Sequence, residues 1–167
     1  MPENRKVAEL MVPLAEYPVV YETDTLKEAI LTLRNYRAAG HHHRSVLVFS
    51  RTKKVQGEEM LVGILTTRDI LNAIKKNKML YDNTELFTMS WAFFYRREPL
   101  EELTITRVGQ AIRPLVDAYV QADDTVTRAI ELMMTKNVNI LPVFEGKKAV
   151  GIIRAIDLLD YIADMLA

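Results

Sequence analysis

The sequence predicts an α+β fold made of two copies of one unit, each running β-α-β-β-α. The first observation is a repeated stretch, GILTTRDIL at 63–71 and GIIRAIDLL at 151–159. The second is that other stretches recur in the same order: VAELMVPL at 7–14 with VGQAIRPL at 108–115, ETDTLKEAI at 22–30 with ADDTVTRAI at 122–130, and SVLVF at 45–49 with ILPVF at 140–144. Self-similarity in register along the chain indicates duplication.

The stretch at 63–71 has the pattern of a short buried strand that turns directly into a helix. Its branched apolar residues suit a buried strand, and Thr66 or Thr67 can cap the helix that follows. Asp69 would then stand in the first helical turn, where the helix dipole favours an acid. The same place suits hydrogen bonds from the hydroxyl groups of a ligand.

The first repeat is predicted to span residues 1–76. We expect a strand at 17–21, a hairpin between strands at 46–49 and 61–65 with the polar residues 50–59 as its loop, and a second helix from Asp69 to about 76. The first helix begins at Asp24-Thr25, where Thr25 and Glu28 have capping-box spacing, and Gly40 ends it. Its expected apolar stripe is Leu26, Ala29, Ile30 and Leu33.

The second repeat is predicted to span residues 107–167 in the same order. We expect strands at 118–121, 140–144 and 150–153, with a tight turn at 145–148. A helix opened by Asp124 or Thr125 should bury Val126, Ala129, Ile130 and Met133, and a last helix should cover 155–165. One such unit has too little apolar surface to cover its own sheet, so we expect the two units to pack sheet to sheet, related by a pseudo-twofold.

Residues 77–106 form a linker or insertion without a counterpart in the repeat. Aromatic residues gather there, followed by a basic pair: Phe87, Trp91, Phe93, Phe94, Tyr95, Arg96 and Arg97. We favour a linker whose aromatic side chains cover exposed core. The alternative is a dimer contact or a partner-docking surface, because aromatic residues and arginine are enriched at interfaces.

Composition narrows the class of protein. Lys plus Arg and Asp plus Glu both number 22, and this balance argues against broad nucleic-acid binding, which needs a basic excess. The chain has no cysteine, so neither a disulfide nor a catalytic thiol is available. No stretch approaches the length of a membrane span, and the N-terminus has no secretory apolar region. We expect a cytoplasmic protein with no membrane partner.

With these repeats, the chain resembles a tandem pair of CBS domains, a regulatory arrangement also called a Bateman module. The family's hallmark is a strand ending in Gly-x-x-Thr-x-x-Asp, after an earlier strand that carries Pro-Val. Gly63, Thr66 and Asp69 fit the first pattern, whereas the second repeat has Gly151 and Asp157 with Arg154 in the threonine position. Pro142-Val143 fits the second pattern, and the first repeat has Leu47-Val48 there. The resemblance covers the chain apart from roughly 75–106.

The resemblance implies that Asp69 accepts hydrogen bonds from the two hydroxyls of a ribose, since a carboxylate has two oxygens. The plainer role for Asp69 is helix capping, and Thr66 likewise is either a cap or a ribose or phosphate contact. Arg44 stands where nucleotide-binding members have a basic residue that meets phosphate; otherwise it is a solvated surface arginine. The second repeat has Asn139 there, so its site either stays empty or uses Arg154 as its own phosphate ligand.

An adenine ring would need an apolar slot beside these polar residues. The slot candidates are residues whose commoner role is core packing. The full set of candidate ligand-binding residues is Pro18, Val19, Arg44, Val46, Val48, Thr66, Arg68 and Asp69 in the first repeat, with Ala118, Tyr119, Ile140, Pro142, Arg154 and Asp157 in the second.

The run His41-His42-His43 raises the question of a metal site. Consecutive residues converge poorly on one ion, and zinc takes three or four ligands from separated positions. We therefore expect a polar loop first, a histidine that assists Arg44 second, and a metal site last. A metal-dependent hydrolase would need such a site. The sequence offers no Ser-His-Asp set, no phosphate-binding glycine loop and no convincing carboxylate pair, so we expect no catalysis, no metal and no cofactor.

The function implied is regulatory binding of AMP, ADP or ATP in the cleft between the two repeats. As the resemblance implies, the module would assemble as a homodimer shaped like a flat disc, and its output would go to an unidentified protein partner. The alternative is a protein-interaction module with empty clefts and residues 91–97 as its contact surface. S-adenosylmethionine, a dinucleotide or a divalent ion remain possible ligands, because the ribose carboxylate suits many adenosyl compounds.

Overall fold

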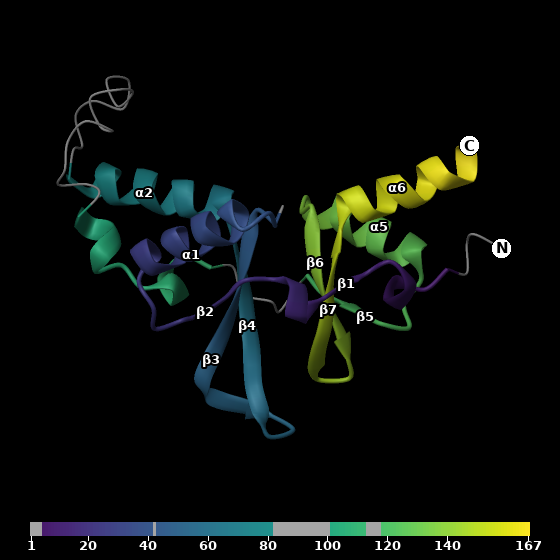
Figure 1. Ribbon diagram of the computed structural model, residues 1–167, viewed down its shortest axis with the longest axis horizontal. Coiled ribbons are helices and arrows are strands. Elements are labelled where there is room, and N and C mark those ends of the chain that lie inside the picture. Colours follow the sequence, from purple (N-terminus) through teal and green to yellow (C-terminus); the bar gives the residue numbers. More distant parts are fainter. Residues whose placement is uncertain (1–4, 42, 82–100, 113–117) are drawn as a thin grey trace. The chain divides into compact units, whose positions relative to one another are not determined.

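A computed structural model describes residues 5–41, 43–81, 101–112 and 118–167 (Figure 1). The aromatic segment around Trp91 and the side chain of His42 therefore lie outside the described residues. Contacts divide the chain into two units, the described residues of 1–17, 53–60 and 114–167 in one and those of 18–52 and 61–113 in the other.

The first repeat has the predicted order β-α-β-β-α, with two helices beside a three-stranded sheet of order β2-β3-β4. Its elements are β2 (Val19–Tyr21), α1 (Leu26–Ala38), β3 (Ser45–Val55), β4 (Glu58–Thr66) and α2 (Thr67–Tyr81). β2 runs parallel to β3. The predicted capping box begins α1, because the Thr25 hydroxyl accepts from the Glu28 N–H at 3.2 Å while the Glu28 carboxylate accepts from the Thr25 N–H at 2.9 Å.

The hairpin between β3 and β4 differs from the prediction that residues 50–59 form a loop. The strands continue to Val55 and resume at Glu58, so the turn is only Gln56-Gly57. Both turn residues have positive φ, 52° and 82°, as a two-residue hairpin turn requires. Most side chains at this end are exposed and polar, so no alternation of apolar and polar residues revealed the strands. α2 also runs beyond the expected end near residue 76, to Tyr81.

The second repeat follows the same order. Its elements are β5 (Val120–Gln121), α5 (Val126–Lys136), β6 (Ile140–Glu145), β7 (Lys148–Arg154) and α6 (Ala155–Leu166). β5 runs parallel to β6, which pairs antiparallel with β7. Thr125 is the N-cap of α5, and its hydroxyl accepts from the Arg128 N–H at 3.2 Å. The mixed α+β class is thus confirmed, with the same five elements in each repeat.

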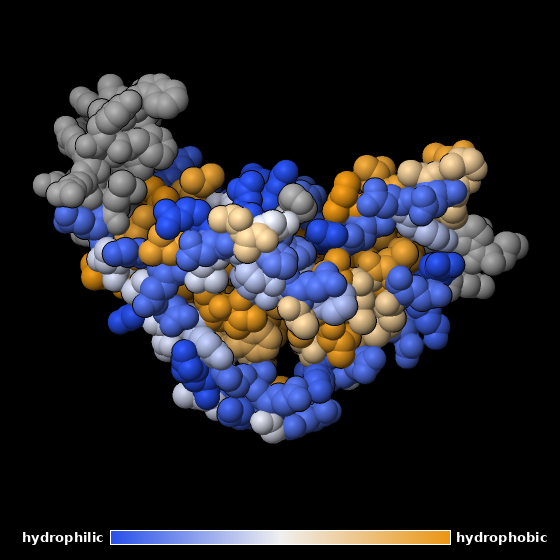
Figure 2. Space-filling model, in the orientation of Figure 1, coloured by the Kyte–Doolittle hydropathy of each residue, from blue (hydrophilic) through white to orange (hydrophobic). Residues whose placement is uncertain are grey.

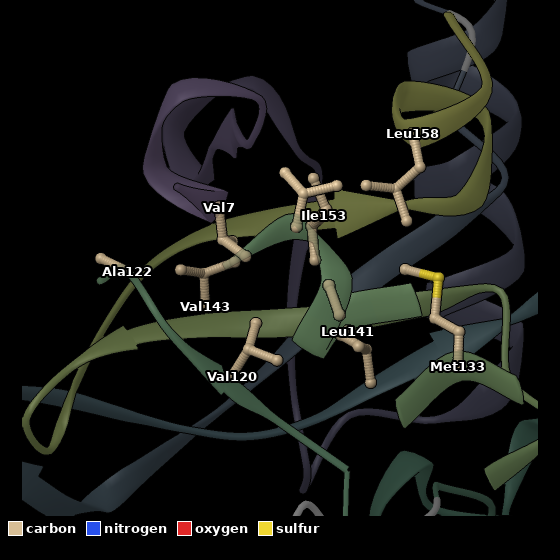
Figure 3. Packing of buried hydrophobic residues seen from close by; sticks show 10 residues of the cluster. Val7, Val120, Ala122, Met133, Leu141, Val143, Ile153 and Leu158 are labelled. Carbon is tan, nitrogen blue, oxygen red and sulfur yellow. The ribbon is translucent and has the colours of Figure 1, made fainter. Parts of the chain in front are cut away.

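Each repeat is completed by a segment that precedes the other repeat in the sequence. The N-terminal strand β1 (Val12–Pro13) pairs antiparallel with β7. Val7, from the short 3-10 helix Val7–Glu9, is 0% exposed in the core of the second repeat (Figure 3). Its counterpart Val108, from the 3-10 helix Val108–Gln110, is 0% exposed in the core of the first.

The backbone bonds of these two exchanged segments match. The Val7 N–H donates to the Asp124 carbonyl at 2.8 Å, and the Val108 N–H donates to the Asp24 carbonyl at 2.8 Å. In the described part of this sequence repeat, residues 7–11 and 108–112 therefore have equivalent backbone contacts, although the repeat gave no sign of the exchange.

Each repeat has its own apolar core. The predicted helix stripes are largely correct, because their most buried members line these cores: Leu26, Ala29 and Leu33 from α1, and Val126, Ala129 and Met133 from α5. Ile30 and Ile130 are only partly buried at the edge of each core. Among the described residues, no helix combines the length and apolar character needed to cross a membrane.

Gly151 of β7 lies opposite Pro13 of β1, and it should not tolerate a side chain. A Cβ atom there would lie 2.5 Å from Met11 Sδ and 3.0 Å from the Val12 carbonyl oxygen. We expect Gly151→Ala to lower the free energy of unfolding by about 1–3 kcal/mol, as overpacking does. Chemical denaturation measures this. Adding Met11→Ala should restore only part of the loss, since the contact with the backbone oxygen remains; a Gly151→Ala protein as stable as the parent would refute this packing.

Candidate functional site

In the first repeat, β4 passes into α2 without a loop, and the side chains of Asp69 and Thr66 hold the turn. The Asp69 Oδ2 atom accepts the Thr66 N–H at 3.0 Å and the Thr66 hydroxyl at 2.9 Å. The same hydroxyl accepts the Asp69 N–H at 3.1 Å, so Thr66 rather than Thr67 caps the helix. Asp69 is 8% exposed, and the turn fixes its carboxylate at the N-terminus of α2.

Two arginines stand close to this turn. The Arg44 carbonyl accepts the Thr67 N–H at 3.3 Å, which brings the start of β3 to the first residue of α2. Arg68 lies in the first turn of α2, and both arginines are exposed. A helix N-terminus attracts anions through its dipole and its N–H groups. The first repeat therefore places one carboxylate and two guanidinium-bearing residues around one helix terminus.

The apolar candidates of the first repeat differ in exposure. Val46 and Val48 are 0% exposed and belong to the core, so their side chains serve packing and only their backbone is available to a ligand. Pro18 is buried, and its carbonyl accepts the Leu47 N–H at 2.9 Å. Val19 is 43% exposed, which leaves it as the apolar side chain of this group that reaches the surface.

The histidine run does not form a metal centre within the described residues, among which no group of three possible ligands occurs. The His41 ring instead stacks on Tyr36, with ring centroids 4.1 Å apart. His43 is half-buried. The polar loop stays a prediction, and the stacking of His41 on Tyr36 is a contact that the sequence did not reveal.

The second repeat builds the same backbone turn with a different side chain. The Arg154 N–H donates to Asp157 Oδ2 at 2.9 Å, as the Thr66 N–H donates to Asp69. The Ala155 N–H donates to the Asn139 carbonyl at 2.9 Å, so Asn139 is the structural counterpart of Arg44. In addition, the Arg154 guanidinium donates from Nε to Oδ2 at 2.9 Å and from Nη2 to Oδ1 at 2.6 Å. One cation thus covers both oxygens of Asp157.

The charged pair of this second turn acts on Tyr17, a residue that the sequence analysis did not single out. The hydrogen bond to Asp157 raises the pKa of Arg154 above its usual value. Burial raises the pKa of Tyr17 to about 12; Asp157 raises it as well, whereas Arg154 opposes the rise. Tyr17 is 4% exposed and follows the 3-10 helix Leu14–Glu16 of the exchanged N-terminal segment. No local motif pointed to it, because only the exchange brings it to this repeat.

The remaining candidates of the second repeat lie along its strands. Ile140 is half-buried and pairs with Arg154 across the sheet, and Pro142 is buried opposite Ile152. Ala118 is half-buried, and Tyr119 is 46% exposed with its ring edge-on to Phe144 at 5.7 Å between centroids. The polar candidates Arg154 and Asp157 therefore meet each other directly.

Solved structures share this architecture. CBSX2 in complex with AMP matches with a TM-score of 0.66 and 16% identity, over 98% of this chain and 99% of that one. The CBS domain of a bacterial CNNM/CorC family Mg²⁺ transporter in complex with ATP matches with a TM-score of 0.66 and 16% identity, over 97% and 89%. The cytosolic domain of the Mg²⁺ channel MgtE in complex with ATP matches with a TM-score of 0.61 and 24% identity, over 95% and 49%. At such identities the likeness shows the fold alone.

Sequence comparison gives the family. No curated protein is similar enough to count as a match. The family model of the CBS domain, however, matches residues 7–76 and 108–164, which together make up most of the chain. These two matches contain the two strand-to-helix turns described above. The chain therefore belongs to the CBS domain family and carries two CBS repeats in tandem.

Proposed function

We propose that the first repeat binds an adenosine nucleotide, AMP, ADP or ATP, and that the protein is a regulatory module rather than an enzyme. The observation that carries the proposal is the turn at Asp69, where a carboxylate and the exposed Arg44 and Arg68 surround the N-terminus of α2. Two structurally similar proteins, CBSX2 and the CNNM/CorC transporter domain, are in complex with AMP and ATP respectively.

The parts of such a ligand suit different residues of this turn. Ribose hydroxyls are donors, and a carboxylate accepts them. The O–H hydrogen of Thr66 can rotate away from Asp69 Oδ2 while the Thr66 oxygen keeps capping the helix, so that Oδ2 can accept a ribose hydroxyl. The backbone N–H of Thr66 keeps its 3.0 Å bond and holds the turn. Phosphate suits the guanidinium groups of Arg44 and Arg68 together with the helix terminus. The exposed Val19 offers an apolar contact to the adenine ring.

A regulatory role requires that the nucleotide favour one conformation or assembly of the module over another. The output then passes to a protein partner. The competing account is a protein-interaction module that binds no nucleotide. Calorimetry distinguishes the two accounts, because it measures directly whether a nucleotide binds.

The charge of Asp69 should be needed for nucleotide binding. We expect Asp69→Asn to weaken binding of AMP or ATP by about 10- to 100-fold, because hydrogen bonds to a charged group contribute roughly 1.5–3 kcal/mol. The matched control is Asp157→Asn, which should bind like the parent. Isothermal titration calorimetry gives both affinities, with thermal melts of the ligand-free proteins to verify folding.

Two results would count against this site. Loss of binding in Asp157→Asn but not in Asp69→Asn would move the nucleotide to the second repeat. A parent protein that binds none of the three nucleotides would remove the proposal and leave the protein-interaction account.

We also propose that the protein associates with a second copy of itself through the outer faces of its helices. The first repeat has a groove of about 850 Å³ between α1 and α2. Its lining is mostly apolar, with two exposed arginines: Ile30, Leu33, Ile70, Leu71, Ile74, Arg34 and Arg37. The exposed Arg68 and Lys75 add to the positive charge of α2.

The corresponding face of the second repeat has the opposite character. Large apolar side chains are exposed on α5 and α6: Met134 at 72%, Ile156 at 50%, Leu159 at 59% and Leu166 at 82%. Figure 2 shows apolar surface along α6. α6 also carries the exposed Asp160 and Asp164 and no lysine or arginine. Met134 and Ile156 occupy the repeat positions of Arg34 and Arg68.

These differences favour contact between unlike faces. The apolar, acidic face of α6 complements the apolar, basic groove of the first repeat, whereas two first-repeat faces would bring arginines against arginines. We therefore propose that the first repeat of one copy packs against the second repeat of the other.

Cross-linking distinguishes unlike from like pairing. Because the chain has no cysteine, Leu71→Cys and Leu159→Cys each introduce a single thiol, at equivalent positions of α2 and α6. We expect a short bismaleimide to join the two variants when they are mixed and to join neither efficiently to itself. Covalent dimers of either variant alone would refute the pairing, and a monomer by light scattering at the same concentration would refute the self-association.

A further inference from the structure

We propose that Arg154 closes the second repeat to nucleotides, so that each chain binds one nucleotide, through the first repeat. The inference rests on the proposed function of the first repeat and adds its stoichiometry and the residue that sets it. Its basis is the contact in which the Arg154 guanidinium donates to both oxygens of Asp157, at 2.9 and 2.6 Å.

The two repeats provide an internal comparison. In both, the backbone N–H of the last strand residue donates to the carboxylate three positions later, at 3.0 Å for Thr66 and 2.9 Å for Arg154. In both, the N–H of the first helical residue donates to the carbonyl of the residue that precedes the neighbouring strand, Thr67 to Arg44 and Ala155 to Asn139. The backbone bonds of the turn are thus the same, whereas the side chain at the threonine position differs between the repeats.

This difference changes what a ribose must displace. In the first repeat the side chain in question is the Thr66 hydroxyl, a neutral group that can also turn away. In the second it is a cation tethered three residues from its partner, which forms a two-pronged, charge-assisted contact. The pair is partly shielded, with side-chain exposures of 30% for Arg154 and 13% for Asp157, so water and salt weaken it less than a surface pair. Ribose hydroxyls therefore compete with an intramolecular cation for both oxygens.

The same contact removes Arg154 as a phosphate ligand. A guanidinium that spans both oxygens of Asp157 is not presented to an incoming phosphate. The neighbouring positions do not replace it, because Asn139 stands at the position of Arg44 and Ile156 at that of Arg68, both without charge. Of the two outcomes that the sequence left open for this site, the geometry favours the empty one.

Arg154→Thr restores the family pattern in the second repeat and should open it. With AMP or ATP as the probe, calorimetry should give about one nucleotide per chain for the parent. It should give about two for Arg154→Thr, in which the N-terminus of α6 would meet the phosphate of the second nucleotide. The double variant Asp69→Asn with Arg154→Thr should bind one nucleotide per chain, in the second repeat. The single variant Asp69→Asn should bind none. Arg154→Ser serves the same purpose if the threonine variant does not fold.

The reverse exchange tests the same contact in the first repeat. Thr66→Arg places an arginine three residues before Asp69 and should abolish binding, whereas Thr66→Ser, the matched control, should retain it. One nucleotide per chain in both Arg154→Thr and Arg154→Ser, lost in each on adding Asp69→Asn, would overturn the inference while the proposed function stands. A parent that binds two nucleotides would also overturn it. A parent that binds none, together with an Arg154→Thr variant that binds one, would overturn the proposed function and the stoichiometry of one, while the closure of the second repeat by Arg154 would stand.

Discussion

Both halves of the protein depend on one interaction, the hydrogen bond from the last residue of a strand to a carboxylate three residues further on. This bond lets β4 continue directly into α2 and β7 into α6. Because no loop separates strand and helix, the position of each aspartate is fixed. It satisfies a backbone N–H at the helix terminus and places an acid where the helix dipole stabilises it. A carboxylate held in this way is both a structural cap and a fixed acceptor. The capping and ligand roles of Asp69 are therefore compatible.

The identical backbone of the two turns makes their side chains informative. A threonine at the strand end gives a small, rotatable hydroxyl, and an arginine gives a long cation that folds back on the acid. Duplication supplied two equivalent turns, and the exchange of threonine for arginine changes which group lies against the carboxylate. The exchanged N-terminal segment adds a second difference, because it brings Tyr17 to the charged pair of the second turn. Burial raises the pKa of Tyr17 to about 12, so its phenol stays protonated far above neutral pH.

Local sequence patterns predicted what local physics determines. The capping box at Thr25 and Glu28, the buried stripes of α1 and α5, and the β-α-β-β-α order all follow from residues close together in the chain, and all are confirmed. Features that depend on distant residues or on side-chain conformation were not predicted. The pairing of β1 with β7 joins residues 12 and 152, and no periodicity encodes it. The hairpin end of β3 and β4, residues 51–60, is mostly exposed and polar, so its composition is that of a loop. The Arg154–Asp157 contact could not be predicted, because it depends on the conformation of the Arg154 side chain.

The most direct test of the account is an amide NMR titration of the parent protein with AMP and with ATP. Binding at the first repeat predicts saturable shifts for the amides of Thr66, Thr67 and Asp69, which line the turn, while those of Arg154, Ala155 and Asp157 stay in place. Shifts confined to the second turn, or no shift at either turn with ligand in large excess, would contradict the account.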